Sequence, residues 1–348
     1  MRYLLSFLLF IIFGASTIAQ ENCALTLENA QKLYDNGMIE EIPNVLAPCM
    51  KSGFNSDERL QAYKLIILSH IFNNNMNEAD KNMLMFLKKY PEYELSASDP
   101  AEFVQLFNTY RTNPFASISL KGGSHINNIK VLQVLRNKPG STGNFYTSST
   151  SFQGGMFFEY NIYNNFFGGT GGNYIFSQWK YTEANYNDTR NDVTIDEAET
   201  SMGVPLYVMY KFAKLSKLEF LACTGYELQY LLSSTHNIET IEQPSGSKNL
   251  LPEFSIIDVR KKLNHNYYLS LITDRKLPRS AFRVEIGYLY GRSNNKLDYK
   301  EYIKILESTT TNDIKEEENK IGQQPDFSVN RLFINIGFTY KFYKPEKK

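Results

Sequence analysis

Nine charged side chains recur in segments whose residues alternate between apolar and polar. They are Lys121, Glu159, Lys211, Glu219, Glu227, Arg283, Glu285, Arg331 and Lys341. An alternating segment directs successive side chains to opposite faces of a strand, so these acids and bases share the face opposite the apolar one. Such groups can pair with one another, or they can line a narrow path for ions. The sequence therefore leaves two alternatives, a closed ion-pair network and a selective pore.

Two histidines closely follow serines, in Ser124-His125 and Ser234-Thr235-His236. A serine, a histidine and an acid together can perform hydrolysis. Adjacency of two residue types does not by itself specify that arrangement. We therefore expect a protein that is not an enzyme, and we keep His125 and His236 as the positions that would test this.

Metal and cofactor chemistry finds little support in the residue spacing. The glycine-rich run 168–172 lies inside an alternating segment and precedes no helix, so it does not match a phosphate-binding loop. The acidic stretch 183–199 could bind a hard cation, but a solvated loop explains it more simply. The other possible metal ligands are the four histidines, and their positions do not have the spacing of metal ligands. They are His70, His125, His236 and His265. We predict no metal and no cofactor.

The charged residues require elements that can place them on one face. From Phe115 the hydrophobic period is two, and aromatic residues, at 14 % of the chain, favour strands over membrane helices. Runs of about ten residues suit tilted membrane strands. The expected strands lie near 115–122, 151–162, 165–182, 200–212, 217–233, 265–274, 280–292 and 330–343. They predict an antiparallel transmembrane β-barrel of about eight strands, with lipid outside and charges in a lumen that side chains fill.

The expected connections alternate between short and long. The short ones fall at 163–164, 213–216 and 275–279, and the long ones at 123–150, 183–199, 234–264 and 293–329. Outer-membrane barrels have short periplasmic turns and long outer loops. Aromatic residues near strand ends are predicted to form girdles at the membrane interfaces. They are Tyr160, Trp179, Tyr181, Tyr230, Tyr288, Tyr290 and Tyr343.

Residues 24–112 have a helical period instead. Two predicted helical hairpins are similar at an offset of 37 positions, with Ala30, Gly37 and Ile42 matching Ile67, Asn74 and Ala79. Tyr63, Ala79 and Pro91 also stand at the offsets of a tetratricopeptide repeat, although Ile67, His70 and Phe86 replace its usual small residues, so we interpret the region as a degenerate tetratricopeptide-like unit. Such a unit can offer a face to a protein partner, or it can serve as a spacer. The fold class is therefore α+β and multidomain.

The N-terminus has the charge, length and small residues of a signal peptide ending at Ala19. The expected domains are the signal peptide at 1–19, a periplasmic helical domain at 20–112 and an outer-membrane barrel at 113–348. Export permits disulfides, and Cys23 and Cys49 form a candidate bridge. Cys223 lies in a strand and is expected to be buried. The formal net charge is zero, so nothing favours nucleic acid as a partner.

Short motifs in both parts of the chain resemble those of a known protein family. They are Ala79-Asp80, Pro91-Glu92-Tyr93, residues 99–104, residues 111–114 and Val204-Pro205-Leu206. With these motifs, nearly the whole mature chain resembles outer-membrane β-barrel proteins of the Bacteroidota, and the barrel resembles the PorT-like branch. The resemblance implies an outer-membrane location. Some PorT-like members serve protein secretion, but no residue here marks that role, and residues 344–348 depart from a common pattern by following the last aromatic residue.

We thus expect a non-enzymatic outer-membrane barrel whose residues 20–112 dock another envelope protein. Its other contact would be outer-membrane lipid. The first alternative is a narrow, porin-like channel for small solutes, because the inner face is polar. The second is a surface adhesin acting through residues 234–264 and 293–329.

Overall fold

The computed structural model describes residues 23–133, 145–149, 151–183, 191–242, 245–250, 252–292, 295 and 326–348. The predicted signal peptide, 1–19, lies outside the described residues. The chain divides into a helical unit, Met1–Pro114 with Tyr343–Lys348, and a barrel unit, Phe115–Phe342. We expected the last six residues to belong to the barrel. They join the helical unit because the tail forms backbone hydrogen bonds with it, from Arg111 N to Glu346 O and from Lys348 N to Thr109 O.

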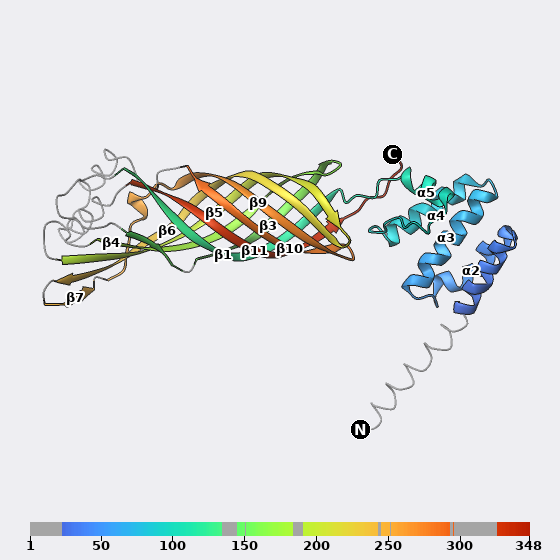
Figure 1. Cartoon of the computed structure of the whole chain (residues 1–348), viewed down its shortest axis with the longest axis horizontal. Helices are drawn as coiled ribbons and strands as arrows, with labels where there is room; N and C mark the ends of the chain where they lie inside the picture. Colours follow the sequence, from blue (N-terminus) through green and yellow to red (C-terminus); the bar gives the residue numbers. More distant parts are fainter. Residues whose placement is uncertain are drawn as a thin grey trace, which may run out of the picture. The chain divides into compact units, whose positions relative to one another are not determined.

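Eight antiparallel strands form a closed ring in the barrel unit. They are β1 (Ala116–Gln133), β3 (Ser151–Tyr163), β4 (Phe166–Glu183), β5 (Asn191–Leu215), β6 (Leu218–Glu242), β9 (Leu263–Leu277), β10 (Ser280–Gly291) and β11 (Asp326–Phe342). Their order around the ring is β1, β3, β4, β5, β6, β9, β10 and β11, and β11 pairs with β1. Figure 1 shows these strands tilted around a common axis.

Tight turns mark one end of the ring, which we call the turn end. Asn164, Ser216 and Arg279 adopt positive φ there, in the two-residue links that follow β3, β5 and β9. Positive φ at such positions matches the twist of the flanking strands. The first residue of β1 and the last of β11 also lie at this end, because Ala116 pairs with Phe342. We call the opposite end the loop end.

Several strands extend farther toward the loop end than the sequence predicted. β5 begins at Asn191 and β6 continues to Glu242, although 183–199 and 234–264 were expected to be loops. The alternation continues there, with Val193 and Ile195 buried and Asp196 exposed. Three short strands extend the sheet further, β2 (Phe145–Ser148) beside β4 and both β7 (Ser247–Leu250) and β8 (Phe254–Ser255) beside β6.

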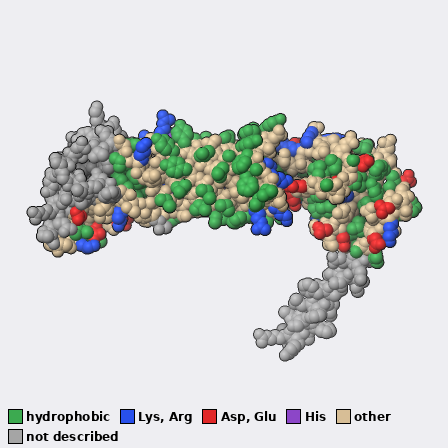
Figure 2. Space-filling view, in the orientation of Figure 1, with side chains coloured by type: hydrophobic (Ala, Val, Ile, Leu, Met, Phe, Trp, Pro, Cys, Tyr) green, Lys and Arg blue, Asp and Glu red, His purple; other side chains and the backbone are tan. Residues whose placement is uncertain are grey.

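The outer surface of the ring carries an apolar belt, defined by the exposed hydrophobic side chains of the eight strands. On β5 it comprises six alternate residues, Met202, Val204, Leu206, Val208, Tyr210 and Phe212. Figure 2 shows hydrophobic side chains over the middle of the barrel. An eleven-residue run is the length that a tilted strand needs to cross a bilayer. The belt is therefore the surface that the alternation predicted.

The helical unit consists of two helical hairpins and a final short helix. Residues 23–35 are helical, followed by η1 (Ile39–Glu41), α2 (Ile42–Lys51), α3 (Ser56–Phe72), α4 (Met76–Lys89) and α5 (Ala101–Asn108). α3 is central, since five consecutive residues from Leu65 to Ser69 are buried. No helix in the described parts of the chain is long and apolar enough to cross a membrane.

The two hairpins match at the positions that the sequence comparison paired. Ala30, Ile42, Ile67 and Ala79 are each fully buried. Gly37 and Asn74 both adopt positive φ, 79° and 57°, in the turn between the two helices of their hairpins. A disulfide also joins Cys23 to Cys49 across the first hairpin, while Cys223 is buried with a free thiol.

Candidate functional site

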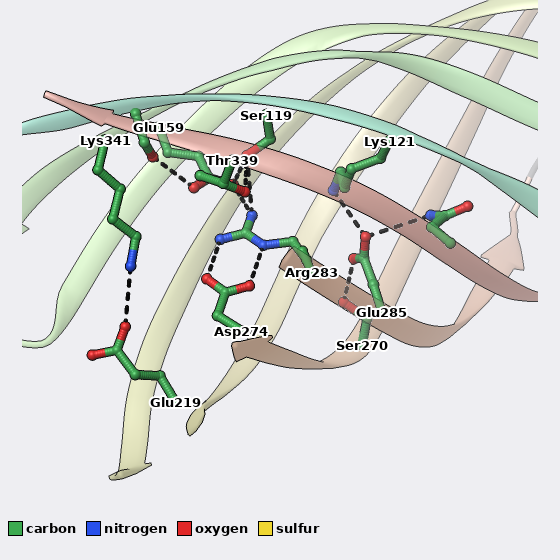
Figure 3. A network of polar contacts seen from close by, with 12 residues as sticks. Ser119, Lys121, Glu159, Glu219, Ser270, Asp274, Arg283, Glu285, Thr339 and Lys341 are labelled. Atoms are coloured by element: carbon green, nitrogen blue, oxygen red, sulfur yellow. Dashed lines mark hydrogen bonds and ion pairs between the residues drawn. The ribbon is translucent and has the colours of Figure 1, made fainter. Parts of the chain in front are cut away.

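The interior of the barrel holds the nine charged residues singled out from the sequence, and each of them contacts a charged partner. Nearest the turn end, the Glu219 carboxylate lies 3.2 Å from Lys211 Nζ, 3.2 Å from Lys341 Nζ and 3.3 Å from Lys276 Nζ. These lysines come from β5, β11 and β9, whereas Glu219 is on β6. Lys341 therefore reaches the carboxylate across the lumen, as Figure 3 shows.

Arg283 forms the next layer of the network. Its Nε and Nη2 atoms donate to the two oxygens of Asp274, at 2.7 Å and 2.9 Å, and Nη1 donates to Glu159. Ser117 and Ser119 also donate to Glu159. All three charged groups are almost completely buried. A guanidinium between two carboxylates satisfies the hydrogen-bonding geometry that buried charges require.

Lys121 and Glu285 form a third layer, with 2.8 Å between Nζ and Oε2. Ser270 donates to the other oxygen of Glu285 at 2.7 Å. The Lys121 ammonium also lies over the Phe157 ring, 4.0 Å from its centroid, a cation–π contact that helps a buried charge. Small residues make room for these large ones, because a Cβ at Gly169 would lie 2.4 Å from the Tyr207 ring.

A small cavity separates this layer from the next. Its volume is about 30 Å³, and polar groups of Lys121, Gln153, Asn173, Glu227 and Glu285 line it. A cavity of this size and polarity has room for bound water.

Arg331 and Glu227 close the cavity toward the loop end, with 2.7 Å between Nη2 and Oε1. Farther along lies a cluster that the sequence analysis missed, centred on Glu197. Arg260 binds both Glu197 oxygens, at 2.8 Å and 2.7 Å, and His236 Nε2 lies 3.1 Å from the same carboxylate. Burial acts to raise the pKa of the Glu197 carboxyl, but Arg260 and His236 hold it below its ordinary value.

The position of Arg260 explains why sequence reasoning did not find it. Arg260 follows η3 (Ile257–Val259), in the irregular segment that connects β8 to β9. Both of these strands pair with β6. No alternation marks such a segment. Asp274 is different, because it lies on β9 in the same parity as the inward residues Ser270 and Ile272, so its inward direction was readable.

An apolar group fills the interior at the loop end. Tyr181, Val193, Ile195 and Ile238 are buried together, and the Trp179 ring lies 5.9 Å from that of Phe327. The prediction that Trp179 and Tyr181 lie at the membrane interface is therefore wrong. Both have the parity of Ser177, whose side chain also points inward, and both are 1 % exposed.

The other predicted girdle residues are placed differently. Tyr160 is exposed near the turn end, and Tyr230, Tyr288 and Tyr290 are exposed nearer the loop end. Tyr343 belongs to the helical unit and not to the barrel. Four of the seven aromatic residues thus lie on the outer surface of the barrel.

The serine–histidine pairs are not arranged for hydrolysis. Ser124 points outward, and His125 Nε2 contacts Ser177 Oγ instead, at 2.9 Å. Ser234 donates to Glu197, at 3.3 Å, and His236 is fully buried. Among the described residues, no group of three or more His, Cys, Asp or Glu side chains could hold a metal ion. Asp188 of the acidic stretch lies outside the described residues.

No family model matches this sequence, and no curated protein matches it. Solved structures with similarity include Neisserial surface protein A, at 12 % identity and a TM-score of 0.30, with 65 % of this chain and 97 % of that chain covered. OprG, an outer membrane protein from Pseudomonas aeruginosa, has 11 % identity, a TM-score of 0.33 and coverage of 67 % and 98 %. The outer membrane protease OmpT from Escherichia coli has 9 % identity, a TM-score of 0.40 and coverage of 66 % and 97 %.

Proposed function

We propose that this protein is a non-enzymatic outer-membrane anchor, whose closed barrel holds in the periplasm a helical unit that binds another envelope protein. The observation that carries the proposal is the network of ion pairs that crosses the described lumen. Ion pairs join strands that are not neighbours in the ring, as between Arg331 on β11 and Glu227 on β6. Because these contacts cross the interior, the barrel is suited to anchoring and not to passage.

The apolar belt supports the membrane part of the proposal. A soluble protein rarely exposes a continuous apolar surface larger than a few hundred Å². Here exposed Leu, Ile, Val, Met, Phe and Tyr side chains alternate with buried polar ones on the strands of a closed ring. Closure satisfies the backbone hydrogen bonds that lipid cannot. The short turns at one end support a periplasmic position for that end, because outer-membrane barrels have short periplasmic turns.

The helical unit supports the docking part. Two hairpins with equivalent buried residues and equivalent turns support a tetratricopeptide-like repeat, and repeats of this kind bind proteins through their helical faces. Phe72 and Met76, at the turn of the second hairpin, are nearly half exposed, and the Phe72 ring lies 6.2 Å from that of Tyr34. An exposed aromatic and methionine pair is typical of a protein-binding surface.

Site-specific photo-crosslinking in cells tests the docking. A photoreactive side chain at Phe72 or Met76 is expected to give discrete adducts with one or a few envelope proteins. Lys248, exposed on β7, is the control position and should not give the same adducts. Identical adducts from both positions, or none from Phe72 and Met76, would contradict the proposal.

The channel alternative is tested separately. Planar-bilayer recordings of the full-length protein should be silent, since ion pairs between strands that are not neighbours, such as Arg331–Glu227 and Lys341–Glu219, cross the lumen. Stable single-channel steps would favour the narrow channel instead. The adhesin alternative is less supported, because residues 254–260, within one of its two proposed loops, contribute the buried Ile256 and Arg260.

A further inference from the structure

The loop-end half of the lumen differs from the turn-end half in how its charges are matched. In the turn-end half, each described carboxylate touches at least one cation, as at Glu219, Glu159 and Glu285. Among the described residues, the loop-end half holds three buried carboxylates, Glu197, Glu199 and Glu227, and two buried cations, Arg260 and Arg331. This region, which we call the upper chamber, has one negative charge in excess when all three acids are ionised.

Glu199 is the carboxylate without a direct ion pair. It lies on β5 two residues from Glu197, with the same inward direction, and it is 5 % exposed. Its neighbours across the sheet are Ser177 on β4 and Ser234 on β6, neither of which is charged. Arg260 already binds both oxygens of Glu197, and Arg331 binds Glu227. Both cations near Glu199 are therefore committed to other carboxylates.

The histidines in the chamber do not supply the missing charge. His236 on β6 contacts Glu197 and Arg260, and burial lowers its pKa although Glu197 acts in the opposite direction. His125 on β1 contacts Ser177 and lies near Arg331, which opposes a second positive charge. An isolated ionised carboxylate in such surroundings costs several kcal/mol, and the usual response is that the group takes up a proton.

The chamber also contains unused hydrogen-bonding groups. Six buried side-chain atoms have no partner among the described residues, namely His125 Nδ1, Asn127 Oδ1, Trp179 Nε1, His236 Nδ1, Asn264 Oδ1 and Arg331 Nη1. They include both donors and acceptors, which is the combination that bound water satisfies. An anion is disfavoured here, because the chamber is already acidic.

We propose that the upper chamber is a closed proton-binding site, in which Glu199 carries one proton beside ionised Glu197 and bound water occupies the remaining polar positions. The proton makes the charges of the three acids and two arginines balance. The proton also gives Glu199 an O–H group that can donate a hydrogen bond to the Glu197 carboxylate, which also contacts Arg260 and His236. Burial and the charge of Glu197 raise the pKa of Glu199 above its ordinary value, although Arg260 and Arg331 oppose the shift.

Infrared spectroscopy of the full-length protein in lipid tests the site. A protonated carboxylic acid has a carbonyl band that the carboxylate lacks, so this band should be present near neutral pH, where an ordinary glutamate is ionised, and disappear at alkaline pH. The band is expected to be absent at every pH above neutrality in Glu199→Gln. The control is Asp196→Asn, because Asp196 is three residues away on β5 but points outward, where it pairs with Lys180. This control should keep the band.

Trp179 provides a second readout, since it is the one tryptophan of the chain and is buried in the chamber. Its fluorescence emission should change with the same titration in the wild type and in Asp196→Asn, and stay constant in Glu199→Gln. A band that persists in Glu199→Gln, or the absence of any band below neutral pH in the wild type, would overturn the proposal. So would a titration that shifts when sodium replaces a large organic cation, because a metal ion would then balance the charge.

Discussion

Asp80 on α4 and Lys347 in the C-terminal tail are 267 positions apart in the sequence, yet Lys347 Nζ donates to Asp80 Oδ2 at 2.7 Å. Tyr110 donates to the other oxygen of the same carboxylate. The first and last parts of the chain therefore form one helical unit, and the barrel sequence is inserted between them.

Removal of residues 343–348 is expected to loosen the helical unit locally. The backbone hydrogen bonds at Arg111 and Thr109 would be lost, so amide exchange at Arg111 should accelerate by tenfold or more, on the order of 1.4 kcal/mol. Hydrogen exchange measured by mass spectrometry on the full-length and truncated proteins checks this. Lys347→Ala alone should cost about 0.5 kcal/mol or less, because its side chain is half exposed.

Replacement of Arg283 by methionine is expected to be severely destabilising. It would leave Asp274 and Glu159 buried without their cation, and removal of one partner from a buried ion pair typically costs about 3–5 kcal/mol. Urea unfolding in lipid vesicles measures the loss. Lys180→Met is the matched control, since Lys180 pairs with Asp196 on the surface and should cost under about 1 kcal/mol. Equal effects of the two substitutions would mean that the Arg283 layer does not hold the lumen together.

Reduction of the Cys23–Cys49 disulfide is expected to lower the stability of the helical unit by about 2–4 kcal/mol, because the bond closes a loop between residues 26 positions apart. Thermal melts followed by the helical circular dichroism signal, with and without reductant, give the measurement. Cys223→Ala should respond to reductant as the wild type does, since the Cys223 thiol is free. An unchanged melting temperature of the helical signal under reductant would argue against the bond.

Stability of the helical unit is expected to fall at acid pH in part through Asp99. Burial acts to raise the pKa of Asp99, but hydrogen bonds from Lys64, the Ser96 N–H and Tyr93 lower it below the ordinary 3.8. The folded state therefore favours the ionised form. This contribution is fully present above the ordinary pKa and is lost as the pH falls through the lower, folded-state value.

Comparison with Asp99→Asn isolates that contribution. The variant should be less stable than the wild type near neutral pH, and the difference should shrink as the pH falls below about 4. Helical circular dichroism during acid titration of both full-length proteins gives the two curves. Parallel curves down to the lowest pH would show that Asp99 does not contribute through its charge.

A lysine at Leu206, near the middle of the apolar belt, is expected to destabilise the barrel in lipid by about 2–4 kcal/mol. Thr200→Lys is the control, because Thr200 is two positions beyond the belt on the same outward face of β5 and should cost about 1 kcal/mol or less. Unfolding from vesicles compares the two. If both substitutions were equally tolerated, the belt would not face lipid.

The sequence alone determined the elements with strong periodicity. The strand segments and the inward direction of residues such as Arg283 and Glu285 follow from a period of two, because a strand has only two faces. The matched hairpins follow likewise from residues 37 positions apart, such as Gly37 and Asn74, whose turns require the same backbone conformation. These features are local, so a local pattern suffices to predict them.

Tertiary structure decided which inward residues meet and where the ring closes. Arg260 contacts Glu197 from an irregular segment 63 positions away in the sequence. No hydrophobic periodicity predicts such a contact. The inward face of β4 carries aromatic side chains at Trp179 and Tyr181. The sequence alone did not distinguish these two residues from an outward-facing aromatic girdle. Lys347 can contact Asp80 because the first residue of β1 pairs with the last residue of β11, which brings the two ends of the barrel sequence together. Long-range contacts depend on the closed ring, and closure is a property of the whole chain.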